Sequence, residues 1–186
     1  MNGLSNVLSK ITAALLAVLL LYGFPMLQNT KRQEDLSQLN AYRIVAQFVD
    51  AVRTKGYITP SMYNEFTGEL GTMMEGFELE MEHRHKKYQP EYEDAADAAT
   101  FLGKFSVHEE AHFGDEIMEQ LFPIEPANSK LESRVYYLSA GDYFDVRLQD
   151  QSKRASSILN RFLYGEDFAS SAAPLEYGGM VLNEDY

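Results

Sequence analysis

An uninterrupted apolar run dominates the start of the chain. Residues 11–27, ITAALLAVLLLYGFPML, carry no charge, and the next charged side chain is Lys31. A helix needs about 20 apolar residues to cross the hydrocarbon core of a bilayer. The pattern therefore predicts a membrane-spanning helix within residues 1–32. Its apolar side chains point around the whole helix, and those expected to face lipid are Ile11, Leu15, Leu16, Val18, Leu19, Leu20, Leu21 and Phe24.

The end of this run favours an anchor that stays attached. A cleaved secretory signal ends in small residues of the A-x-A type, whereas residues 22–29 read YGFPMLQN. A cleaved signal is the alternative. Lys10 precedes the run and Lys31 and Arg32 follow it, so the positive-inside rule separates the two orientations only slightly. We expect a single-pass protein of the cell membrane, with the short N-terminus inside and the rest of the chain extracytoplasmic.

Periodic patterns after the run predict one domain over residues 33–186. Apolar residues recur every three or four positions over 34–55, which indicates an amphipathic helix that ends before Gly56. This stripe packs either on the protein's own sheet or on a partner helix, and both alternatives stay open. Thr59 as N-cap and Pro60 at the first helical position begin a second helix over 60–70. The stripe residues considered for a partner helix are Leu36, Leu39, Val45, Phe48 and Val52.

Alternating patterns predict the strands. Residues 77–87 alternate apolar and charged positions, and His83 and His85 fall on the apolar side. Residues 135–138 and 143–149 read as a hairpin, and residues 177–182 as a closing strand. Two further helices are expected over 107–122 and 153–164, and residues 89–104 read as an exposed loop. These elements predict an α+β fold with a small antiparallel sheet packed against helices on one side.

Composition narrows the function classes. The chain has 28 acidic and 16 basic residues and a net charge of −12. Because nucleic-acid phosphates require a clustered positive surface, we expect no nucleic-acid partner. Cysteine is absent, which excludes disulfides, thiolate metal sites and thiol nucleophiles. No cofactor is expected.

One catalytic motif is present in literal form. Residues 108–112 read HEEAH, and on a helix His108 and His112 would share a face and bind Zn²⁺ while Glu109 activates water. A third ligand is missing, because no histidine follows His112 and Glu132 lies among turn residues without a helical pattern. We therefore interpret the motif as a solvated helix face with two surface histidines. A zinc hydrolase and a nonhydrolytic metal site are the alternatives.

The second histidine pair has a similar interpretation. His83 and His85 share one face of the predicted strand and could bind a metal ion together. We interpret them as polar residues at the end of a strand, and the sequence predicts no metal site and no catalytic residue.

Several segments together resemble a known family. They are Phe24-Pro25-Met26 at the end of the apolar run, residues 48–53 (FVDAVR), residues 56–60 (GYITP), residues 81–85 (MEHRH), residues 141–144 (GDYF) and residues 177–181 (YGGMV). This combination resembles the pilin-like or minor pseudopilin-like membrane proteins of Tad-type (tight adherence) pilus and secretion systems in Gram-positive-type bacteria. The resemblance implies an N-terminal helix, half in the membrane, that carries a small α+β head. It also implies a role in assembling or priming an envelope filament, without catalysis.

The chain departs from that family at its N-terminus. Many pilins carry a glutamate a few residues into the processed chain, but Leu8 stands five residues after Gly3. This departure favours an unprocessed anchor that contacts the machine laterally. The expected partners are membrane lipid and protein subunits of a pilus or secretion assembly. An anchored extracellular binding module is a further alternative, for which Tyr136, Tyr137 and Tyr143 would have to form an exposed aromatic groove.

Overall fold

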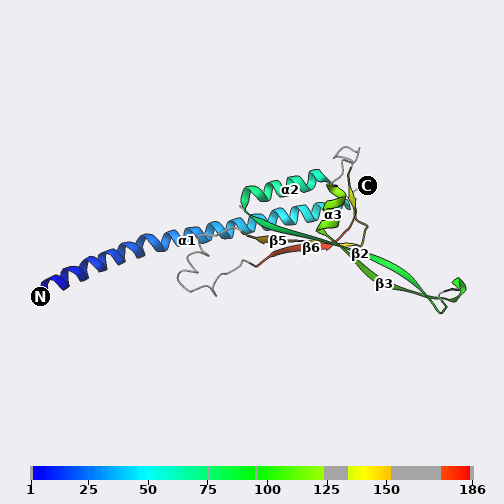
Figure 1. The fold of residues 1–186 in the computed structure, drawn as a ribbon, viewed down its shortest axis with the longest axis horizontal. Helices are drawn as coiled ribbons and strands as arrows, with labels where there is room; N and C mark the ends of the chain where they lie inside the picture. The colour runs from blue at the N-terminus through cyan, green and yellow to red at the C-terminus, as the bar shows by residue number, and fades with distance from the viewer. Residues whose placement is uncertain (1, 75, 95, 124–133, 152–172, 185–186) are drawn as a thin grey trace. The chain divides into compact units, whose positions relative to one another are not determined.

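The computed structural model describes residues 2–74, 76–94, 96–123, 134–151 and 173–184, and it combines helices with antiparallel sheets (Figure 1). The α+β class is therefore confirmed. The chain divides into two units: the described part of the first is residues 2–40, and the second begins at Ala41. The predicted boundary at residue 33 lies within the first unit, and each unit is described by itself.

Helix α1 (Asn2–Lys55) includes both the apolar run and the amphipathic segment. Pro25 lies inside this helix. The helix ends where the sequence places the stop. Gly56 adopts φ 72° and its N–H donates to the carbonyl of Val52 at 2.8 Å, a left-handed cap that glycine adopts without steric cost.

Helix α2 (Pro60–Met73) begins as predicted and runs three residues further than expected. The Thr59 hydroxyl accepts a hydrogen bond from the Met62 N–H at 3.2 Å, which satisfies one of the free donors of the first turn. Phe66 and Leu70 are buried. The rings of Phe48 and Phe66 stack with centroids 4.2 Å apart, and this contact joins α2 to the end of α1.

The main sheet has four antiparallel strands in the order β3-β2-β5-β6. These strands are β2 (Phe77–Tyr92), β3 (Phe101–Phe113), β5 (Tyr143–Asp150) and β6 (Leu175–Met180). A separate short pair joins β1 (Tyr57–Ile58) to β4 (Tyr136–Tyr137). The expected closing strand over 177–182 appears as β6, which pairs with β5.

One face of the sheet forms the core of the second unit. Phe144, Val146 and Leu148 of β5 are buried, and they lie opposite His83, Met81 and Leu79 of β2. The sheet packs against α1, where Val45, Val49 and Val52 are fully buried, and against α2. The opposite face is polar, because β2 places Glu78, Glu80 and Glu82 there.

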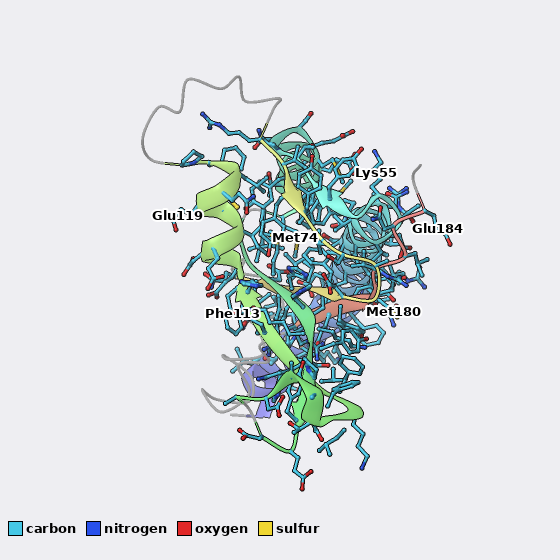
Figure 2. All side chains as sticks on the ribbon, turned by 90° about the vertical axis from the view of Figure 1, so that its right-hand side faces the viewer. Lys55, Met74, Phe113, Glu119, Met180 and Glu184 are labelled. Carbon is cyan, nitrogen blue, oxygen red and sulfur yellow. The ribbon has the colours of Figure 1, made fainter. Side chains whose placement is uncertain are left out.

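The region 89–113 differs most from prediction. Residues 89–104 are not a loop: β2 continues to Tyr92, a short 3₁₀-helix η1 (Ala98–Thr100) follows, and β3 begins at Phe101. The predicted helix over 107–122 is also wrong in its first half, because residues 107–113 belong to β3. Helix α3 covers only Gly114–Leu121, directly after Phe113 (Figure 2).

Strand pairing explains these differences. Residues 105–113 pair with residues 82–90 in continuous register, which satisfies backbone groups that a helix would satisfy internally. Pro90 is tolerated because β5 pairs with β2 only as far as Arg84, which leaves the other edge of β2 open at Pro90. Ile117 and Leu121 are buried as the helical spacing predicts, whereas Phe113 is exposed.

The predicted hairpin over 135–149 is wrong as well. The turn exists, since the Asp142 N–H donates to the Ser139 carbonyl at 3.1 Å and Gly141 adopts φ 92°. However, β4 pairs with β1, whereas β5 pairs with β2 and β6. A local turn signal therefore did not determine which strands pair. The predicted helix 153–164 lies outside the described residues.

Candidate functional site

The apolar segment of α1 is exposed in the first unit. The eight side chains predicted to face lipid have between 54% and 71% of their surface exposed. Residues Val7–Pro25 form the single helix in the described part of the chain that is long and apolar enough to cross a membrane. An exposed apolar surface of this length has no favourable environment in water.

The predicted partner-helix stripe divides between two environments. Val45 and Val52 are fully buried and Phe48 is nearly so, and all three belong to the core of the second unit. Leu36 and Leu39 are exposed. The intramolecular interpretation therefore accounts for the C-terminal half of the stripe, and no described residue covers Leu36 or Leu39 of its N-terminal half.

The HEEAH motif lies on strand β3, so its helical geometry is absent. In a strand each residue advances the chain by about 3.3 Å, which places the Cα atoms of His108 and His112 about 13 Å apart. Two histidines at that separation do not bind one ion. His108 and Glu109 are exposed, and Glu132 lies outside the described residues. The predicted solvated helix face is therefore wrong as to its helix: the motif is on a strand, where His108 is exposed and His112 is half-buried.

The second histidine pair forms the most organised polar cluster of the described residues. Strand alternation points His83 and His85 of β2 to the core side of the sheet, toward Asp142 in the turn before β5. The Asp142 carboxylate receives His83 Nε2 at 2.9 Å and His85 Nδ1 at 2.9 Å, each on a different oxygen. The Ser139 N–H also donates to Asp142 Oδ2 at 2.8 Å. His83 is 4% exposed and Asp142 is 2% exposed.

Hydrogen-bond chemistry fixes the tautomer of His83. Ionised Asp142 only accepts hydrogen bonds, so His83 Nε2 must carry a proton and donate it. His83 Nδ1 then accepts from the hydroxyl of Tyr136, with 2.7 Å between the two atoms. Both ring nitrogens of a neutral His83 are satisfied in this way.

The pKa shifts agree with a neutral histidine beside an ionised aspartate. Burial lowers the pKa of His83, and this effect outweighs the opposing hydrogen bond and charge of Asp142. Burial alone would raise the pKa of Asp142, but hydrogen bonds from His83, His85 and the Ser139 N–H bring it below its ordinary value. Burial, with smaller contributions from Glu116 and Asp142, raises the pKa of Tyr136 to about 12.

A third histidine borders this cluster. His112 of β3 is the cross-strand partner of His83, and their ring centroids are 5.6 Å apart. His112 Nδ1 contacts Glu116 Oε2 of α3 at 2.6 Å. His112 therefore has its own carboxylate partner and lies beside the Asp142 cluster without contacting Asp142.

The tyrosines considered for a binding groove lie apart. Tyr136 is buried against His83, and Tyr137 is exposed on the next position of β4. Tyr143 lies under the guanidinium of Arg84, 4.4 Å from the ring centroid. Because these side chains serve separate contacts, they do not form the aromatic groove that the binding-module alternative requires.

The polar face of the sheet carries an acidic groove of about 540 Å³. Its lining includes Glu80, Glu82, Asp145 and Glu176, with Arg147 as a basic member. Burial raises the pKa of Asp145, and the charge of Glu82 raises it further. The groove repels anions and contains no histidine or nucleophile among its lining residues.

The β2–β3 ribbon carries an exposed apolar surface. Beyond Arg84, β3 is the only described strand that pairs with β2, and this two-stranded part is called the arm (Figure 1). The cross-strand pairs Tyr88–Val107, Pro90–Phe105 and Tyr92–Phe101 follow one another along it, and alternation places the first two pairs on one face. The apolar members of the arm that are substantially exposed are Tyr88, Tyr92, Phe101, Leu102, Phe105 and Val107.

Comparison of the chain with protein-family models, with curated proteins and with solved structures found no match. Function is therefore inferred from the geometry of the described residues. Sequence reasoning placed His83 and His85 on one strand face but missed their partner Asp142. The available signal was the position of Asp142 after the Gly141 turn, at the start of a strand.

Proposed function

We propose that this protein is a non-catalytic, membrane-anchored structural or assembly component of a bacterial pilus-like or secretion apparatus. In this proposal residues 7–25 span the cell membrane once, and the second unit is an extracytoplasmic head that acts by touching neighbouring subunits. The single observation that carries the proposal is the exposed apolar segment of α1. The same helix continues, through residues 41–52, into the core of the head.

The arm supports a function by contact. Exposed apolar patches on a water-soluble domain are typical of protein–protein contacts. Among the described residues, none of the arm belongs to the buried core of the second unit. A neighbouring protein subunit is the occupant that suits an arm whose open strand edges offer hydrogen-bonding groups as well.

The hydrolase alternative loses its structural basis with the helix at residues 107–113. No catalytic arrangement of nucleophile, base and metal ligands is found among the described residues outside the Asp142 cluster. The specific assignment to a Tad-type system rests on the sequence resemblance alone.

Co-purification from the native cell tests the proposal. The protein is solubilised from membranes with detergent, captured and analysed for bound proteins, using wild type, Phe105→Lys and Gln89→Lys. Phe105 is on the apolar face of the arm, whereas Gln89 is on its other face. We expect envelope-assembly subunits with wild type and Gln89→Lys, and a several-fold loss with Phe105→Lys.

Two results would contradict the proposal. One is that no filament or secretion component co-purifies with the wild-type protein and that deleting its gene leaves the apparatus intact. The other is loss of the subunits from Gln89→Lys as large as from Phe105→Lys, which would contradict contact through the apolar face of the arm.

Because the chain has no cysteine, its orientation in the membrane can be measured by labelling single introduced cysteines. Single-cysteine variants Asn2→Cys and Ser61→Cys have no competing thiol in the chain. A membrane-impermeant maleimide should label Ser61→Cys in cells with an accessible envelope and Asn2→Cys only after the membrane is opened. The reverse pattern would place the head inside the cell.

A further inference from the structure

The cluster around Asp142 brings three metal-type donor groups together. One ligand atom from each of His83, His85 and Asp142 lies within 4.8 Å of the other two. Two imidazole nitrogens and one carboxylate oxygen suit zinc-like ions, whereas Mg²⁺ and Ca²⁺ prefer all-oxygen sites. We propose that His83, His85 and Asp142 bind one divalent transition metal ion.

Both histidine nitrogens already lie close to the Asp142 carboxylate. With metal–ligand bonds of about 2.0 Å, tetrahedral coordination separates ligand atoms by about 3.3 Å. His83 Nε2 and His85 Nδ1 each lie 2.9 Å from a different oxygen of Asp142, and the ligand atoms lie within 4.8 Å of one another. Binding would draw the two nitrogens toward one ion, which would replace the protons on His83 Nε2 and His85 Nδ1.

Contacts behind the ligands already hold them in place. Metal-binding histidines usually hydrogen-bond through their second nitrogen, which orients the ring. His83 has this partner in the Tyr136 hydroxyl, 2.7 Å from Nδ1. When His83 Nε2 binds the ion, it no longer carries a proton. The neutral ring then carries its proton on Nδ1, which donates a hydrogen bond to the Tyr136 oxygen. Asp142 is held by the Ser139 N–H at 2.8 Å.

The cluster also leaves a route for the ion. The side chain of His85 is 34% exposed, so one edge of the site reaches solvent. Three protein ligands leave a fourth position for water. The ion would connect β2 to the turn that precedes β5, and it would thereby stabilise the head. The metal site is independent of the contacts through which the head is proposed to act.

Metal binding is tested on the untagged full chain in detergent. Zn²⁺ is titrated by calorimetry and counted by elemental analysis after dialysis, with Mg²⁺ as a comparison ion. We expect one Zn²⁺ per chain and no comparable binding of Mg²⁺. His85→Ala should lose saturable binding, and Tyr136→Phe should weaken it by about 10- to 100-fold. Bound Zn²⁺ should raise Tm, and a chelator should reverse the rise.

His108→Ala is the matched control, because His108 is an exposed histidine on β3 outside the cluster. Its binding should equal that of wild type. No saturable Zn²⁺ binding by wild type, or full binding by His85→Ala, would overturn the site. Loss of binding in His108→Ala would also overturn it, by placing the ion at the HEEAH motif.

An NMR measurement on the wild-type protein tests the metal site even if His85→Ala does not fold. In NMR spectra Zn²⁺ should shift the imidazole signals of His83 and His85 and leave those of His108 in place. Unchanged His83 and His85 signals at saturating Zn²⁺ would contradict the proposal. Co-purification of assembly subunits is independent of these readouts, so failure of the metal site and failure of the proposed contact function are distinguishable.

Discussion

At the scale of single residues, the most informative position is His83, because burial keeps it neutral against the opposing charge of Asp142. Hydrogen bonds to Asp142 and Tyr136 satisfy both ring nitrogens, and burial disfavours the charged ring. The titratable groups around it are His85 on the same strand, and His112, Tyr136 and Asp142 on other segments. Such a residue makes stability depend on pH.

The sign of this dependence follows from the lowered pKa of His83. Once the pH falls below the unfolded-state value of about 6.5, the unfolded chain binds a proton that the folded head resists. We therefore expect the free energy of unfolding of metal-free protein to fall as the pH is lowered below about 6.5. Denaturant titrations followed by circular dichroism measure it, since the chain has no tryptophan.

His83→Gln is the comparison for this measurement. Glutamine does not titrate, so its variant should be less stable at neutral pH but should lose less stability between neutral pH and the acid range. An identical pH dependence in wild type and His83→Gln would show that other groups cause it.

Alanine substitutions of two glycines test the packing of β6 and α2. A Cβ on Gly178 of β6 would lie 2.9 Å from the Phe144 carbonyl oxygen, a backbone contact that cannot move away easily. Gly178→Ala should therefore lower the free energy of unfolding by about 1–3 kcal/mol. Gly68 of α2 has no atom within 4 Å of such a Cβ, so Gly68→Ala should raise it by about 0.5–1 kcal/mol. Similar effects of both substitutions in denaturant titrations would contradict the placement of β6 against β5.

At the scale of elements, helix α1 contains two different apolar surfaces. Phe48 stacks on Phe66 and contacts Phe144, whereas Leu39 is 66% exposed. Phe48→Ala should lower the free energy of unfolding by about 3–5 kcal/mol, and Leu39→Ala should change it by less than about 0.5 kcal/mol. Thermal and denaturant unfolding of the two variants measures the difference. A large loss in Leu39→Ala would show that the stripe continues into the core through residue 39.

Helices were predicted best where local signals agreed. Thr59, Pro60 and Gly56 mark helix ends through their own backbone chemistry, and the structure begins α2 and ends α1 at these positions. The strand β2 was also visible, because strict alternation from Phe77 to His85 has no helical alternative.

Partners distant in sequence were not predictable in the same way. The spacing of Phe113, Ile117 and Leu121 suggested one helix, but Gly114 separates a strand from a helix at that point. The strand forms because β2 offers an open edge to residues 101–113, which no local pattern reveals. The choice of β1 as the partner of β4 has the same origin.

The candidate site was predictable only in part for the same reason. Alternation placed His83 and His85 on one face, yet Asp142 and Tyr136 are more than 50 positions away in the chain. Their approach depends on β5 pairing with β2 and on β4 pairing with β1. Tertiary structure assembles this cluster, and a motif of neighbouring residues does not.

At the scale of the whole molecule, the N-terminal segment decides whether the head is tethered to a membrane. An exposed apolar helix of residues 7–25 is typical both of a retained anchor and of a signal sequence that is removed. A retained anchor makes the head a membrane-tethered contact domain. A removed segment would release the head from the membrane and would leave contact through the arm as its remaining means of association.

The most direct test is the intact mass and N-terminal sequence of the protein purified from the membrane fraction of its native cell. We predict a membrane-bound chain with a mass close to 21.1 kDa that still contains residues 7–25. A protein recovered from aqueous fractions, with a mass that shows the first 30 or so residues removed, would contradict the account.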